Sequence, residues 1–378
     1  MFSVKNYIYY IIAGLSFILF VITADFRSMS SNLLKPEPAR ILFAILAAAF
    51  LISCFAVNSG SISGLKTLAR LACYACVFVA FFILAGKRLC SGGLFDRYML
   101  VFLSAGMLLC ILSLAMYFTG SGGSSEYSFA AHGIFMHPNT ASFMYIIVMP
   151  ALIYFYKTGK AGLPVFLMAM LVLTAGLLLT FSRAGYIGAF SSVLIFVFLC
   201  SKRKALLLTL TLIASVLLIN LLMDFITAKQ DSSFGRLLLA TAALSMIFES
   251  QGSFLWGYGV ARGLDIFRDE KILFGSYEFV DDPHNFILLL GIQFGMIVAL
   301  LSAVIPAFII VRSLLKSKNI FQMADLMRIY LASAVASGLL INNMFEDIIA
   351  YPEYYIMPLF LMFTGYIYFK TSSAADGN

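Results

Sequence analysis

The stretch Asp281–Val311, DDPHNFILLLGIQFGMIVALLSAVIPAFIIV, contains the pattern that decides the fold. Residues 286–311 form an uncharged hydrophobic run, long enough to cross the roughly 30 Å hydrocarbon core of a bilayer as one helix. Asp281, Asp282 and His284 stand directly before this run. We therefore expect a histidine and two carboxylates at the boundary between water and lipid, where a long polar loop turns back into the membrane.

The composition indicates an integral membrane protein. Of 378 residues, 62% are hydrophobic and 11% are charged, whereas soluble domains are nearer half apolar and a quarter charged. The apolar runs are uniform rather than alternating, which favours helices over a membrane β-barrel. Eleven spans are predicted, near 7–24, 39–57, 67–85, 98–118, 139–156, 163–180, 185–200, 205–226, 286–311, 327–345 and 354–369. The first has no small-residue cleavage site and is expected to be uncleaved.

Basic residues in the short connections set the predicted orientation. The cytoplasmic connections are marked by Lys87, Arg88, Arg97, Lys157, Lys160, Lys202, Arg203, Lys204, Arg312, Lys316 and Lys318, and Lys370 places the C-terminus inside. Eleven spans would then put Lys5 outside, so a twelfth, missed or split span is expected within the first hundred residues. We expect one membrane domain, with an N-terminal bundle at 1–226, a large periplasmic loop at 227–285 and C-terminal spans at 286–378. Residues 236–248 are predicted to form a short interfacial helix in that loop, with Leu237, Ala240, Leu244, Ile247 and Phe248 as its apolar positions.

The formal net charge of +7 does not indicate a nucleic-acid-binding protein. The predicted loop 227–283 carries five basic and eight acidic residues, so it is not a basic surface for a polyanion. We interpret the positive charge as the bias of cytoplasmic connections.

Four residues on the predicted outer face are candidates for chemistry. His284 is suited to general-base catalysis, with Asp281 or Asp282 orienting its ring, or it caps the following helix. Arg183 lies between apolar spans, and either binds an anion such as a diphosphate or ends a helix as a snorkelling side chain. Arg236 and Arg262, taken alone, are typical of solvated loop surface.

Other polar residues leave two interpretations open. Asn342, Asn343, Glu346, Asp347 and Glu353 gather at an outer helix end, and they line a sugar-binding cleft or represent ordinary helix-end polarity. His132 and His137 form a weak pair on a glycine-rich loop, and no HExxH or similar spacing is present. No metal and no cofactor is expected.

With these motifs in hand, residues 130–310 resemble the O-antigen ligase and polymerase superfamily, multi-span bacterial glycosyltransferases that use undecaprenyl-diphosphate-linked glycans. The resemblance rests on the order and sidedness of Gly133–Asn139 (GIFMHPN), Thr180–Gly185 (TFSRAG), Gly235-Arg236, Trp256–Gly259 (WGYG), and His284–Leu288 (HNFIL) with Gly295. Gln293 and Val298 depart from the family pattern, which has glutamate and glycine there, and put the packing of that helix in doubt.

The resemblance implies a mostly helical, GT-C-like fold in the bacterial inner membrane, with a periplasmic, metal-independent active site. It assigns the diphosphate to Arg183 and Arg262, with Arg236 as a third arginine, and activation of the acceptor hydroxyl to His284. The remaining residues that we expect at the substrate site are His137, Asn139, Gly257, Gly259, Asp282 and Asn285.

We therefore predict transfer of a glycan from undecaprenyl diphosphate to a hydroxyl acceptor, as an O-antigen ligase acting on lipid A–core. A polymerase that uses a second lipid-linked glycan as acceptor is the alternative within the family. A lipid-linked glycan transporter or flippase is the alternative from another class, favoured by prolines within the spans but not by charges gathered at one face. The enzymatic prediction requires Arg183 and His284 to converge in one cationic pocket that is open to the lipid bilayer and the periplasm.

Overall fold

The computed structural model describes residues 72–91, 93–120, 137–202, 230–273, 282–317, 322–346 and 356–373, together with short pieces at 45–49, 52, 130–131, 133, 135 and 350. All regular secondary structure in these ranges is helical. The chain divides into two compact units, each described by itself. The first unit comprises Met1–Leu84, Leu212–Ile309 and Asn343–Leu361, and the second comprises Ala85–Thr211, Ile310–Asn342 and Met362–Asn378. The domain boundaries predicted at 226 and 285 stay a prediction.

The second unit is built around one central helix. Helix α7 (Pro138–Lys157) packs against α6 (Leu94–Thr119), α8 (Leu163–Leu179) and α9 (Arg183–Cys200). Its side chains Phe143, Tyr145 and Ile146 are fully buried. The short α5 (Gly86–Leu89) packs beside α6, and most of α16 (Met323–Asn343) belongs to the same unit.

Small residues let α7, α9 and α16 approach closely. A Cβ added to Gly188 of α9 would lie 2.6 Å from Ile146 Cδ1 and 2.8 Å from Asn342 Cβ. A Cβ added to Gly338 of α16 would lie 2.6 Å from Ser192 Cβ. Because lipid tails are as apolar as leucine, membrane helices associate through such close packing rather than through the hydrophobic effect. This packing holds the first turns of α7 and α9 at the same end of the unit.

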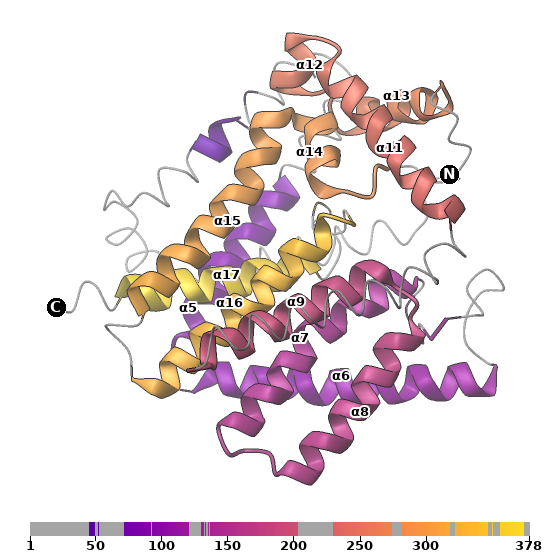
Figure 1. The fold of residues 1–378 in the computed structure, drawn as a ribbon. Helices are drawn as coiled ribbons and strands as arrows, with labels where there is room; N and C mark the ends of the chain where they lie inside the picture. Colours follow the sequence, from indigo (N-terminus) through magenta and orange to yellow (C-terminus); the bar gives the residue numbers. More distant parts are fainter. Residues whose placement is uncertain are drawn as a thin grey trace. The chain divides into compact units, whose positions relative to one another are not determined.

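The first unit contains a group of short helices beside a long one. Helices α11 (Gln230–Phe248), α12 (Gln251–Trp256), α13 (Val260–Leu273) and α14 (Phe286–Phe294) pack against one another (Figure 1). Helix α15 (Met296–Ser317) follows α14 in the chain.

The prediction of one span over 286–311 is wrong, because the helix breaks at Gly295. Gly295 has φ 87° and ψ 161°, a conformation open essentially to glycine alone, and α14 and α15 point in different directions on its two sides (Figure 1). The WGYG turn docks here: Tyr258 N donates to Ile292 O at 2.7 Å and Gly259 N donates to Gln293 O at 3.0 Å. Most apolar side chains of α14 are buried within the protein, with Ile287 and Leu288 partly exposed, and the candidate span begins at Met296.

Six described helices are long and apolar enough to cross a membrane: Ala72–Leu89, Leu94–Thr119, Pro138–Lys157, Arg183–Cys200, Met296–Ser317 and Met323–Asn343. Ala72–Leu89 includes the π-helical stretch η1 (Phe78–Ala85). The apolar helix Leu163–Leu179 is shorter, and α17 (Ile356–Ser373) coincides with the predicted span 354–369. Predicted spans 7–24, 39–57 and 205–226 lie wholly or largely outside the described residues. The fold class, an all-α polytopic membrane protein, is confirmed, and the total of eleven or twelve spans stays a prediction.

Candidate functional site

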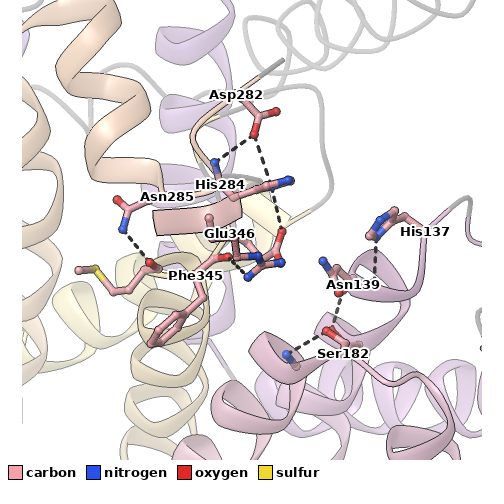
Figure 2. Close-up of polar contacts among 12 residues, drawn as sticks. His137, Asn139, Ser182, Asp282, His284, Asn285, Phe345 and Glu346 are labelled. Carbon is pink, nitrogen blue, oxygen red and sulfur yellow. Dashed lines mark hydrogen bonds and ion pairs between the residues drawn. The ribbon is translucent and has the colours of Figure 1, made fainter. Parts of the chain in front are cut away.

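Asn285 fixes the start of α14. Its Oδ1 accepts hydrogen bonds from Ile287 N at 2.9 Å and Leu288 N at 3.1 Å, which makes it the N-cap. Its Nδ2 donates to Met344 O at 2.6 Å (Figure 2). The start of α14 is thereby tied to the segment that follows α16, and the predicted role of Asn285 in substrate binding stays a prediction.

His284 directly precedes this cap in an unfavourable backbone conformation. Its φ is 49°, and Phe181 is the other non-glycine residue with positive φ in the described part of the chain. The carboxylate of Asp282 holds the turn, because Asp282 Oδ1 accepts from His284 N at 3.1 Å. Left-handed backbone is uncommon for a residue with a Cβ and is frequent at functional sites. Asp282 is thus placed beside the histidine, as predicted, while Asp281 lies outside the described residues.

The imidazole of His284 lies between two carboxylates. Its Nδ1 is 3.4 Å from Asp282 Oδ1 and 3.7 Å from Glu346 Oε2 (Figure 2). Nδ1 is buried and makes no hydrogen bond to any described residue, so the two carboxylates act on it through charge.

Glu346 joins this histidine to an arginine. Its Oε1 accepts from Arg236 Nη2 at 3.1 Å, and Arg236 Nη1 donates to Phe345 O at 3.2 Å. The Glu346 side chain is 4% exposed. Burial raises the pKa of Glu346 above its ordinary value, and the electrostatic interactions with Arg236 and His284 oppose that shift.

Arg236 keeps part of its binding capacity. A guanidinium carries five N–H donors, and the two hydrogen bonds above use two of them. The side chain is 35% exposed, so its other donors can reach an anion. We name the set Asp282, His284, Arg236 and Glu346 the histidine cluster. The sequence identified the first three as site residues, but Glu346 was noted only as one of several polar residues at a helix end.

In the second unit, two helix starts are tied together. His137 Nδ1 accepts from Asn139 N at 3.1 Å and caps α7, and Ser182 Oγ accepts from Gly185 N at 3.1 Å and caps α9. Ser142 Oγ donates to Asn139 O at 2.6 Å and lies 3.1 Å from Ser182 Oγ (Figure 2). His137 therefore acts as the N-cap of α7 through Nδ1.

Arg183 is the first residue of α9 and follows the Ser182 cap. Its side chain is half-buried. The positive end of the helix dipole adds to the guanidinium charge, which makes this helix start attractive to an anion. Arg183 belongs to the second unit and His284 to the first, so their convergence in one pocket stays a prediction.

The other predicted site residues of the first unit, Arg262, Gly257 and Gly259, lie outside the histidine cluster. Arg262 is exposed on α13 and forms no hydrogen bond or ion pair with any described residue. Gly257, with φ 71°, has no room for a side chain, because a Cβ would lie 2.7 Å from Gln293 C. Gly257 and Gly259 hold the WGYG turn against the end of α14, and their predicted role in substrate binding remains a prediction.

The fold and the site define a polytopic helical membrane protein with a partly buried cluster of a histidine, two carboxylates and an arginine at a helix start. Residues 165–303 match the family model described as O-antigen ligase. This segment includes Arg183, Arg236, Arg262 and His284. This match confirms the resemblance to the O-antigen ligase and polymerase superfamily over the matched segment and supports a glycosyltransferase-like function. Searches of curated proteins and of solved structures found no match.

Proposed function

We propose that this protein transfers a glycan from undecaprenyl diphosphate to a hydroxyl acceptor on the periplasmic face of the bacterial inner membrane. The proposed acceptor is lipid A–core, which makes the protein an O-antigen ligase. The observation that carries the proposal is the histidine cluster, in which His284 Nδ1 lies 3.4 Å from Asp282 and 3.7 Å from Glu346.

In this reaction His284 is the general base. The acceptor oxygen attacks the anomeric carbon of the donor sugar, and its proton moves to the imidazole. Because Nδ1 faces both carboxylates, Nε2 is the nitrogen available to the hydroxyl. Glu346 and Asp282 then stabilise the imidazolium, as the acid of a catalytic triad does. General-base catalysis of this kind contributes about 10²–10⁴-fold to a rate.

The leaving group is undecaprenyl diphosphate, and arginines offset its charge. The bond between the anomeric carbon and the phosphate oxygen breaks, so negative charge develops on that oxygen. We assign the diphosphate to Arg183 and Arg262, with the remaining donors of Arg236 as a third contribution. Planar guanidinium groups bind two phosphate oxygens side by side and keep their charge in a partly dry site.

A shared pocket for Arg183 and His284 is part of this proposal. Both residues lie within the matched segment 165–303. Cysteines replacing Tyr186 and Ile287, each about one helical turn from one of these residues, provide a test through bifunctional cross-linkers of graded length. Efficient cross-linking by the short reagents is expected. Cross-linking by the long reagents alone would show that Arg183 and His284 are too far apart to share a pocket.

The activity test uses purified protein with an undecaprenyl-diphosphate-linked glycan and lipid A–core. Wild type is expected to form the glycan–core product, and Arg183→Lys is expected to lose most activity because a point charge cannot form the two parallel hydrogen bonds. Arg268→Lys is the matched control, since Arg268 is exposed on α13 and pairs locally with Asp265. Equal activity of Arg183→Lys and wild type would contradict the diphosphate assignment.

A polymerase differs from a ligase in the acceptor. Deleting the gene separates the two. Bare core with polymer retained on the carrier indicates a lost ligase, whereas a single repeat unit on the core indicates a lost polymerase. The first result is the one that we expect.

A further inference from the structure

Helix α11 exposes a line of large apolar side chains. Leu237 and Phe248 are each 62% exposed and Leu244 is 41% exposed. Their spacing of seven and four residues places them on one face of the helix, with exposed Thr241 between them. We call Leu237, Thr241, Leu244 and Phe248 the apolar stripe. Eleven residues of helix make it about 16 Å long.

The opposite face of α11 is already occupied by protein. Leu239, Ala242, Ala243, Met246 and Ile247 are all buried, and α11 packs against α13 and α14. Ile247, predicted to face the interface, is among them. The helix is therefore apolar on both sides, and its apolar part, Gly235–Phe248, is too short to cross a bilayer. Such a stripe requires an apolar partner.

The charges near the stripe favour a bound lipid over general anchoring in the bilayer. Helices that lie in the membrane surface carry several lysines or arginines on their polar face. From Gly235 to Phe248 the sequence contains one charged residue, Arg236, and its guanidinium binds Glu346 and Phe345 O. Arg236 also directly precedes Leu237, so the stripe begins at the histidine cluster. A cationic group followed by an apolar track matches an anionic head followed by a hydrocarbon tail.

We propose that the apolar stripe binds the polyprenyl chain of the lipid diphosphate whose head lies at the histidine cluster. The identity of this lipid rests on the proposed function, and the stripe is an additional subsite that no catalytic step requires. The isoprene units nearest the diphosphate pack on Leu237, and later units of a long chain reach Leu244 and Phe248. Binding through these last two side chains depends on the length of the prenyl chain.

The test measures the dissociation constants of undecaprenyl diphosphate and geranyl diphosphate for the purified full-length protein in detergent. The double variant Leu244→Ala/Phe248→Ala removes the far end of the stripe. Leu167→Ala/Leu171→Ala is the matched control, because these side chains have the same four-residue spacing on α8 and are also exposed. Truncating two side chains that bury against the tail is expected to raise the Kd for undecaprenyl diphosphate roughly tenfold or more, with the Kd for geranyl diphosphate unchanged.

Three other outcomes would contradict the proposal, each for a different reason. An equal rise for both lipids would mean that the stripe supports the fold or the head site. An unchanged Kd for undecaprenyl diphosphate would place the tail elsewhere and leave the stripe to the bilayer. An equal effect of the α8 pair would show a general response to lost apolar surface. Chain-length-dependent binding without glycan transfer by wild type would uphold the stripe and refute the proposed function.

Discussion

Two clusters of charged side chains, one in each unit, differ in how fully their hydrogen-bonding groups are paired. In the second unit, Asp96 accepts from Arg328 Nε at 3.0 Å and Arg328 Nη2 at 2.8 Å. It also accepts from Lys160 Nζ and from the Tyr154 hydroxyl, each at 2.6 Å. Arg328 further pairs with Asp325 at 2.9 Å, and Asp325 pairs with Lys370 at 3.1 Å. Both oxygens of Asp96 are fully hydrogen-bonded.

The histidine cluster of the first unit is arranged differently. Its imidazole Nδ1 is buried without a hydrogen bond to any described residue, and the hydrogen bonds of Arg236 to described residues use two of its five donors. Its histidine is held at φ 49°. Buried polar groups in stable cores are normally satisfied, so unsatisfied groups and backbone strain together indicate function rather than stability. The comparison favours a role in stability for the Asp96 cluster and supports the proposed chemistry at the histidine cluster.

The largest expected effect is on catalysis. His284→Asn should lower the rate of glycan transfer by about 10²–10⁴-fold, because the general base is lost. Asparagine tolerates the left-handed backbone, so the melting temperature should stay close to wild type. Initial rates and thermal unfolding of the same preparation measure both. A melting temperature well below that of wild type would instead indicate that His284 has a structural role.

Asp96→Asn should show the opposite behaviour. Removing the charge leaves Arg328 with Asp325 as its remaining carboxylate, and breaking such a partly buried pair is expected to lower the free energy of unfolding by about 3 kcal/mol. The rate per folded molecule should remain near wild type. Denaturation in detergent checks the first expectation and active-fraction-corrected kinetics the second. Normal stability with lost activity would reverse the assignment of the two clusters.

Glu346→Gln tests the electrostatics of the histidine cluster through pH. Burial raises the pKa of Glu346 above its ordinary value of 4.5, so its contribution to stability is complete below that value and is lost as the pH rises through the raised pKa. Wild type should therefore lose stability relative to Glu346→Gln as the pH increases from about 4.5. Melting temperatures of both proteins across this range give the difference. A constant difference, or one of opposite slope, would show that Glu346 is not stabilised in its protonated form.

The smallest expected effect concerns the scaffold of the cluster. Asn285→Ala removes the cap of α14 and should cost about 1 kcal/mol of stability. Asn285→Asp keeps the capping oxygen but loses the donor to Met344 O. If the tie to Met344 positions Glu346 beside His284, Asn285→Asp should retain stability and lose activity. Full activity in Asn285→Asp would make Asn285 a cap and nothing more.

Much of the fold could be predicted from hydropathy. Residues such as 98–118, 139–156 and 185–200 are uniform apolar runs, and helices of matching bounds are present. The run 286–311 misled the prediction because hydropathy does not distinguish burial in lipid from burial in protein. Its break depends on the positive φ of Gly295 and on the WGYG turn, which docks from more than thirty residues earlier in the chain.

The site could be predicted only in part, because it also depends on a contact between segments that lie far apart in the sequence. His284, Asp282 and Arg236 carry recognisable chemistry near motifs, and the structure places these three in one cluster. Glu346 could not be assigned, because it joins the cluster from a distant part of the sequence and resembles ordinary helix-end polarity until its burial is known. Conversely, His137 and Asn285 prove to be helix caps, a role that their motifs do not distinguish from substrate contact.

The dependence of the transfer rate on pH, compared between wild type and His284→Asn, tests the central claim most directly. A general base acts only in its deprotonated form, so the proposed role of His284 predicts that the wild-type rate falls as the pH is lowered. The variant should be slow at every pH and should lack this decrease. A variant that keeps the wild-type rate, or the same acid limb, would contradict the assignment of His284 as the group that accepts the proton.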